Sequence, residues 1–225
     1  MEKQTEKHEG KAKKTKRKNG TGTYRFVRGL LGWFVRLIHR IHIVGRENEP
    51  DATKGPYLLV CNHLQWCDPI WICVALKYQQ PHYMAKKELF GIPVLGGLIR
   101  KLGAYPVNRG GADVGAVRHT IELLKNGVSV GMFPQGHRYP GVDPRTTPIR
   151  PGAGMIAQHA DVPVLPVFIK TKDNRPKFLR RVDIIIGKPI PPEELHYNKE
   201  ASGEYARMTE EIFERVCALG DSAGN

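Results

Sequence analysis

The main part of the chain alternates short apolar runs with stretches in which apolar residues recur every three or four positions. The short runs have the length and the Val, Ile and Tyr content of buried strands. Strands are therefore expected at residues 41–46, 57–61, 82–85, 104–108, 128–133, 162–169 and 181–187. The helical pattern predicts helices at residues 69–79, 94–101, 112–126, 152–160 and 204–219.

Strands that alternate with helices are typical of an α/β protein with a mostly parallel sheet flanked by helices. With 225 residues the chain is long enough for one sizeable domain, which is expected to cover residues 46–225. In sheets of this kind, functional sites form where strands end and the following helices begin. Polar residues at those points are therefore the first candidates for chemistry.

Residues 24–43 carry a different pattern. Wound as a helix, they leave a broad face of Leu, Ile, Phe, Val and Trp beside one arc of basic residues and glycines. The longest uncharged run, residues 29–35, is too short to span a bilayer. The pattern favours an amphipathic helix that lies in the membrane interface, and residues 24–45 are predicted to be this membrane-associating segment. A helix packed on the protein's own core remains the alternative.

The positive charge is concentrated at the amino-terminal end. Residues 1–46 hold thirteen Lys or Arg and three Glu, so they supply most of the formal net charge of +13. Residues 1–23 have almost no apolar side chains and are expected to be a disordered basic tail. Each basic residue near an anionic lipid surface contributes about 1 kcal/mol to binding. An anionic membrane is therefore the expected partner, and nucleic acid is not, because the tail lacks aromatic residues that could stack on bases.

Cysteine usage and the amino-terminal pattern bear on the compartment. The four cysteines have no C-x-x-C spacing, so neither a zinc cluster nor a secreted disulfide framework is expected. No apolar core with a small-residue cleavage site, the pattern of a signal peptide, is present. The predicted location is the cytoplasmic face of a membrane, with peripheral or monotopic attachment.

The stretch "CNHLQWCDP" at residues 61–69 follows an apolar strand and holds His63 and Asp68. Residues five apart face different sides of a helix, so these two can meet only if the chain turns between them. Asp68 is a good N-cap, and Pro69 is a good first helical residue. The pair could be a turn, or it could transfer protons, with the carboxylate fixing the imidazole tautomer. A metal site would need further ligands at suitable spacing, and none is evident.

Two possible nucleophiles are set aside. Residues 127–131, "GVSVG", match the G-x-S-x-G nucleophile elbow, but that motif needs a strand before the serine and a helix after it. Here a helical pattern precedes and an apolar run follows, so Ser129 is expected within a strand. Cys67 lies inside the His63–Asp68 stretch, but a small buried thiol is the commoner role of cysteine.

Three further stretches join the His63–Asp68 turn in a familiar order: "GAYPVNRG" (103–110), "FPQGHR" (133–138) and "VPVLPVFI" (162–169). With "NHLQWCD" they correspond to the four motifs of the glycerophospholipid acyltransferases, N-H-x4-D, G-x-x-F/Y-x-x-R, F-P-E-G-T-R and V-P-x-x-P-V. The segment "AKKEL" (85–89) also resembles that family. Over residues 40–190 or so, the chain is similar to the 1-acyl-glycerol-3-phosphate acyltransferases.

This resemblance implies an enzyme that acylates 1-acyl-sn-glycerol-3-phosphate to phosphatidic acid in phospholipid biosynthesis. His63 would be the general base on the acceptor hydroxyl, and Asp68 its orienting partner. Arg138, Arg109 and Lys86 would be the phosphate ligands, since guanidinium groups pair well with phosphate oxygens. The turn at Gly136 would let backbone amides approach the substrate or an oxyanion. The co-substrate would be acyl-CoA or acyl-acyl carrier protein, with no further cofactor.

The third motif departs from the family pattern. Gln135 stands where the family has Glu, and His137 stands where it has Thr or Ser. Gln135 keeps the shape but loses the charge, so it either supports a loop or selects a different acceptor, for example a lyso-aminolipid. His137 is either a further ligand or a wedge in the turn. A hydrolase that releases acyl groups, and a nucleic-acid-binding protein, are the alternatives to an acyltransferase.

Overall fold

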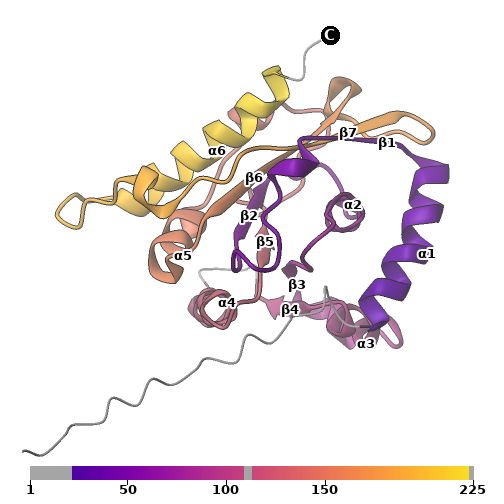
Figure 1. Ribbon diagram of the computed structural model, residues 1–225, viewed down its shortest axis with the longest axis horizontal. Coiled ribbons are helices and arrows are strands. Elements are labelled where there is room, and N and C mark those ends of the chain that lie inside the picture. The colour runs from indigo at the N-terminus through magenta and orange to yellow at the C-terminus, as the bar shows by residue number, and fades with distance from the viewer. Residues whose placement is uncertain (1–21, 109–112, 223–225) are drawn as a thin grey trace, which may run out of the picture.

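The structure, a computed structural model, describes residues 22–108 and 113–222, and a seven-stranded sheet forms its centre (Figure 1). The strand order is β1-β7-β6-β2-β5-β3-β4, and all neighbours are parallel except β6 and β7. The strands are β1 Arg40–Val44, β2 Leu58–Cys61, β3 His82–Lys86, β4 Ala104–Val107, β5 Val130–Met132, β6 Val164–Thr171 and β7 Arg181–Ile186. The predicted α/β fold with a mostly parallel sheet is confirmed.

Helices cover both faces of this sheet. They are α1 Gly22–Ile38, α2 Asp68–Ala75, α3 Leu95–Lys101, α4 Val114–Lys125, α5 Gly152–Ala160 and α6 Glu204–Ser222. Figure 1 shows α4, α5 and α6 on one side, α1 and α2 on the other, and α3 near the β4 edge. Short 3-10 helices lie at Arg46–Asn48, Lys87–Gly91, Pro144–Thr146, Lys172–Asn174 and Pro192–Leu195.

Strand β2 lies at the centre of this arrangement, and all four of its residues are buried. Leu58 and Val60 face the core beneath α4, α5 and α6, whereas Leu59 and Cys61 face the core beneath α2. A strand covered on both faces reads as a continuous apolar run, which explains why "LLVC" does not alternate. Its carboxyl end is thereby held rigidly in the middle of the sheet, where the His63 segment begins.

The predicted amino-terminal helix is only partly right. Helix α1 begins at Gly22 and ends at Ile38, and the next residues form β1, paired with β7 from Arg40↔Arg181 to Val44↔Ile185. The segment 24–45 is therefore not one helix, because Ile41 and Ile43 pack on the core beneath α2. The predicted tail, residues 1–23, lies outside the described residues except for its last two, which are helical. Within the described ranges, no helix is both long and apolar enough to cross a membrane.

Helix α2 is also shorter than predicted. It ends at Ala75 because the amides of Lys77, Tyr78 and Gln79 all donate to the carboxylate of Glu49, at 2.6 to 3.1 Å. Glu49 is buried and comes from a distant loop. A local helical pattern cannot reveal such a long-range acceptor, so the sequence overextended this helix.

Candidate active site

The segment between β2 and α2 is pinned at its start by Asn62. Its side-chain amide donates to the carbonyl of Ile169 at 3.1 Å, and its side-chain oxygen accepts from the amide of Ile169 at 2.8 Å. Ile169 lies in β6, the strand formed by the "VPVLPVFI" motif. Asn62 thus ties the carboxyl end of β2 to the neighbouring strand, and His63 follows from a fixed point.

His63 and Asp68 meet as the motif predicts. Nδ1 of His63 lies 2.8 Å from Oδ2 of Asp68, and that oxygen also accepts from the amides of Leu64 at 2.6 Å and Gln65 at 2.8 Å. With the Asp68 carboxylate as acceptor, the neutral imidazole carries its proton on Nδ1, which makes Nε2 the nitrogen with a free lone pair. Asp68 is the first residue of α2 rather than its cap, and it is fully buried. The arrangement is that of a base held in one tautomer by a carboxylate.

The ring of His63 is fixed on its flat side as well. It stacks on Phe133, with ring centroids 4.1 Å apart and an interplanar angle of 17°. Phe133 immediately follows β5, the next strand of the sheet. The imidazole is therefore constrained both in its plane, by Asp68, and perpendicular to it, by Phe133.

Gln135 is a buried support for the backbone of His63. Its Oε1 accepts from the amide of His63 at 2.6 Å, and its Nε2 donates to Oγ1 of Thr147 at 2.7 Å. The amide of Tyr139 donates to the carbonyl of His63 at 3.0 Å, so the 133–139 turn holds both backbone groups of this residue. With both ends of its amide bonded inside the protein, Gln135 has the geometry of the loop support that the sequence left as one of two alternatives.

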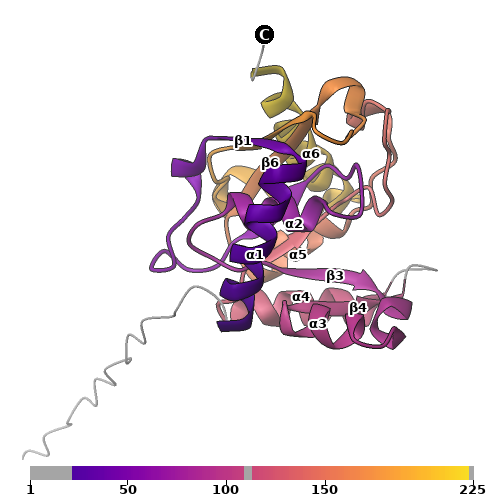
Figure 2. The ribbon, with the colours of Figure 1, turned by 90° about the vertical axis from the view of Figure 1, so that its right-hand side faces the viewer.

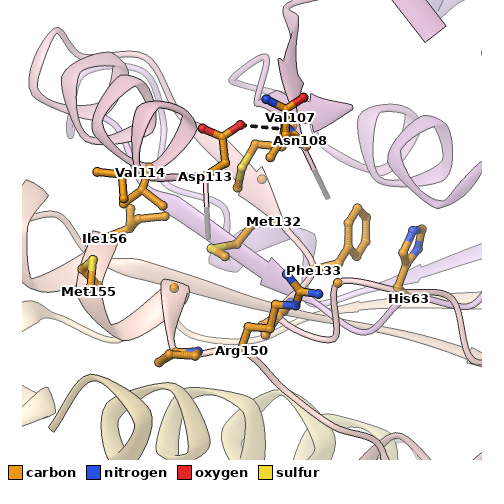
Figure 3. Close-up of a pocket in the computed structure, with 17 residues that line it drawn as sticks. His63, Val107, Asn108, Asp113, Val114, Met132, Phe133, Arg150, Met155 and Ile156 are labelled. Atoms are coloured by element: carbon orange, nitrogen blue, oxygen red, sulfur yellow. Dashed lines mark hydrogen bonds between the residues drawn. The ribbon is translucent and has the colours of Figure 1, made fainter. Parts of the chain in front are cut away.

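A cavity of about 380 Å³ begins at His63. Its lining is mostly apolar and comes from the ends of β4 and β5 and from α4 and α5. Figure 3 shows His63 and Phe133 at one end of the lining, and at the other end the side chains of Val114, Met155 and Ile156. His63 thus borders a mostly apolar cavity and not open solvent alone.

The two predicted phosphate ligands that the structure describes, Arg138 and Lys86, do not line this cavity. Both are exposed, and Lys86 lies 3.3 Å from Glu88. Arg109 lies outside the described residues. Their roles in phosphate binding stay predictions. A different cation, Arg150, does line the cavity, and no sequence motif pointed to it.

Gly136 and His137, the other predicted site residues of the third motif, lie in different environments. Gly136 lines the cavity with a positive φ of 68°, and its amide donates to the carbonyl of Phe133 at 3.1 Å. The turn expected there is present, but this amide is already bonded and does not point to an oxyanion. His137 is exposed and is not among the lining residues that the structure describes.

Neither residue set aside as a nucleophile is suited to that role. Ser129 directly precedes β5, at the amino end of the strand and away from His63. It is buried, and its hydroxyl accepts from the amide of Tyr57 and donates to Oε1 of Gln79. Burial, followed by the nearby charge of Asp68, raises the pKa of the Cys67 thiol to about 12. A thiol with this pKa is almost entirely protonated at neutral pH, so it is a poor nucleophile.

Comparison with known proteins shows the family of this chain. The model of the Acyltransferase family matches residues 40–170. A 1-acyl-sn-glycerol-3-phosphate acyltransferase of Bacillus subtilis (strain 168) is 31% identical over 200 residues, covering 87% of this chain and 96% of the relative. One from Streptococcus pneumoniae is 30% identical over 198 residues, covering 86% of this chain and 72% of that protein.

The fold is matched as well. The crystal structure of the 1-acyl-sn-glycerophosphate (LPA) acyltransferase PlsC from Thermotoga maritima superimposes with a TM-score of 0.65 and 26% sequence identity, over 90% of this chain and 83% of that one. The matched family region contains the whole His63–Asp68 turn and the Gln135 support. The chain belongs to the Acyltransferase family and is an enzyme of that class.

Proposed function

We propose that this enzyme transfers a fatty acyl group from a thioester, acyl-CoA or acyl-acyl carrier protein, to the free hydroxyl of 1-acyl-sn-glycerol-3-phosphate. The product is phosphatidic acid, an intermediate of phospholipid biosynthesis. The relatives described above are named as acyltransferases of 1-acyl-sn-glycerol-3-phosphate, which supports this acceptor. The observation that carries the proposal is the 2.8 Å contact between His63 and a fully buried Asp68 at the mouth of an apolar cavity.

The proposed proton transfers follow from the tautomer of His63 in which Nε2 carries no proton. Nε2 of His63 takes the proton of the acceptor hydroxyl, and the oxygen forms a bond to the thioester carbonyl carbon. The carbon–sulfur bond then breaks, and the imidazolium returns its proton to the thiolate that leaves. Asp68 stabilises the positive charge on the ring between these two steps. No covalent intermediate on the protein is needed, which fits the positions of Ser129 and Cys67.

The cavity supplies a place for the acyl chain. Beyond His63 its apolar walls include methionine, valine and isoleucine side chains from β3, β4, β5, α4 and α5. Burying a hydrocarbon chain there stabilises the complex by about 0.8 kcal/mol per methylene group. The chain would then extend away from His63, and the thioester carbonyl would remain beside the base.

The proposed partner is an anionic membrane surface on the cytoplasmic side, and α1 has the shape for it. One side of α1 packs on the protein through Tyr24, Gly32 and Val35. On the other side, among the side chains of α1 that the structure describes, four large apolar ones are exposed: Phe26, Leu30, Trp33 and Phe34, at 72, 60, 68 and 50%. One face of this helix packs on the protein, as the alternative interpretation expected, and the opposite apolar face would contact lipid. Figure 2 looks directly onto α1.

A second exposed apolar group, at the tip of the β6–β7 connection, lies beside the carboxyl end of α1. In the β6–β7 connection, Phe178 and Leu179 are 68 and 55% exposed, and the amide of Leu179 donates to the carbonyl of Ile38 at 2.9 Å. Exposed Lys177 and Arg180 flank this pair. Apolar side chains surrounded by basic ones suit the interface of an anionic bilayer. This tip would extend the docking surface formed by α1.

The experiment that tests the function uses the purified full chain with radiolabelled acyl-CoA or acyl-acyl carrier protein and a panel of lysolipids. We expect labelled phosphatidic acid from 1-acyl-sn-glycerol-3-phosphate. Preferred use of a lyso-aminolipid would replace the proposed acceptor, and release of label as free fatty acid without any acceptor would identify a hydrolase. His63→Ala, with an unchanged melting temperature, should abolish transfer.

A further inference from the structure

We infer that Arg150 binds the phosphate group of the acceptor lysolipid and so places the acceptor hydroxyl on His63. This inference rests on the proposed function and adds a residue that neither the motifs nor the comparisons assign. Arg150 lies between the third motif and α5, in the segment "TTPIRPG". In Figure 3 its side chain rises from the floor of the cavity, toward the end where His63 and Phe133 lie.

The backbone of Arg150 is fixed to the same turn that supports His63. Its amide donates to the carbonyl of Pro134 at 2.9 Å. Thr147, three residues earlier, receives the hydrogen bond from Gln135, whose other end holds the amide of His63. The backbones of His63 and Arg150 are therefore attached to the same hydrogen-bonded turn.

Gly136 leaves space for the side chain of Arg150 over the turn. A Cβ at residue 136 would lie 3.1 Å from Nε and 3.4 Å from Cδ of Arg150, closer than most side-chain contacts. The positive φ of Gly136 is also one that other residues rarely adopt. The glycine of the third motif thus leaves room for a cation over the turn, although its own amide is engaged.

Arg150 is free to take a ligand. Its guanidinium makes no hydrogen bond or ion pair with any residue that the structure describes. Arg145 on the same loop contrasts with it, since it bonds Asp221 at 2.6 Å and lies 3.6 Å from Glu214. An arginine without a described protein partner, in the same cavity as His63, has the donors that a phosphate needs.

The only carboxylate of the described lining lies elsewhere in the cavity. Asp113 accepts from the amides of Asn108 at 2.8 Å and Ala116 at 2.9 Å, and these bonds lower its pKa. It is therefore anionic, and it would repel a phosphate. Figure 3 places it near Asn108, away from His63 and Arg150. The distribution of charge favours a phosphate at the Arg150 end.

Two substrates carry phosphate, and their geometry distinguishes them. In the acceptor, the phosphate is a few bonds from the hydroxyl that reacts, so its ligand must lie close to His63. In the donor, the whole pantetheine arm separates the thioester from the nearest phosphate. A cation in the same cavity as the base therefore fits the acceptor phosphate.

The test compares Arg150→Gln and Arg150→Lys with Arg145→Gln, a matched control on the same loop. For 1-acyl-sn-glycerol-3-phosphate, losing a charged hydrogen bond should raise KM about 10- to 100-fold in Arg150→Gln, with partial recovery in Arg150→Lys. Inhibition by glycerol 3-phosphate should weaken by a similar factor. Turnover of 1-monoacylglycerol, which has no phosphate, and the KM for acyl-CoA should stay within about twofold. Arg145→Gln should behave as wild type, and equal melting temperatures show intact folding.

Other outcomes would overturn the inference. A raised KM for acyl-CoA alone would assign Arg150 to the donor phosphates, and an equal loss of kcat with both acceptors would assign it to the thioester carbonyl. Unchanged kinetics together with unchanged inhibition by glycerol 3-phosphate would show that Arg150 binds no phosphate. If the wild-type enzyme acylates no phosphate-bearing acceptor, the proposed function itself fails, and this is visible before any variant is made.

Discussion

Replacing Asp68 by Asn separates the charge of this residue from its shape. Oδ2 accepts three hydrogen bonds, from Nδ1 of His63 and from the amides of Leu64 and Gln65, whereas the buried Oδ1 has no partner. In Asp68→Asn, the amide oxygen would occupy the position of Oδ2 because the NH2 group cannot face three donors. The three bonds can then persist, and the new NH2 is buried without an acceptor.

The expected effects follow from this geometry. An unsatisfied buried donor costs about 1–3 kcal/mol of folding stability. At an effective dielectric constant of 20, opposite charges about 4 Å apart attract by about 4 kcal/mol, and part of this is lost as the imidazolium forms. Each 1.36 kcal/mol is about a factor of ten in rate, so kcat should fall about 10²- to 10³-fold. Asp68→Ala should be far less stable, since it leaves all three donors without an acceptor.

The assay is acyl transfer measured for Asp68→Asn, His63→Ala and the double variant, with melting curves to confirm folding. Because Asp68 acts through His63, the second substitution should change the residual rate of His63→Ala by less than about threefold. Two results would refute the reasoning: an Asp68→Asn enzyme with more than about a tenth of wild-type kcat, or full additivity in the double variant. The second result would show that Asp68 does not act by orienting the ring.

Three further predictions concern the support, the docking helix and the thiols. Gln135→Glu should keep acyl transfer but lose about 1–2 kcal/mol of stability in urea unfolding, because a carboxylate cannot donate to Thr147. A Trp33→Ser/Phe34→Ser variant should bind anionic vesicles at least about tenfold more weakly in flotation assays, since two large exposed apolar side chains are lost. Because the raised pKa of Cys67 keeps it protonated, iodoacetamide at pH 8 should modify it about a thousandfold more slowly than a free thiol, and activity should persist.

Each of these has an informative failure. A changed acceptor preference in Gln135→Glu would assign substrate selection to this residue. Unchanged vesicle binding of the α1 variant would show that α1 is not part of the docking surface. Binding to neutral vesicles, and binding at high salt, measure how much of the vesicle affinity is electrostatic. Rapid inactivation by iodoacetamide would place a reactive thiol at the site after all.

The sequence by itself determined the local features of this protein. Alternating apolar runs predicted all seven strands to within a few residues, because buried strands must be apolar whatever surrounds them. The Asp-Pro pair after "CNHLQWC" predicted the turn that brings His63 to Asp68, since both partners lie within one short segment. The glycine at position 136 marked a turn with positive φ for the same local reason.

Only the tertiary structure decided the relations between distant segments. It showed that Glu49 ends α2, that α1 packs by one face and exposes the aromatic one, and that Gln135 connects the His63 turn to Thr147. It also placed Arg150 in the lining of the cavity, whereas Arg138, the arginine of the third motif, is not among the lining residues that the structure describes. These facts depend on which segments are neighbours in space, and a hydrogen bond across many residues leaves no periodic signal along the chain.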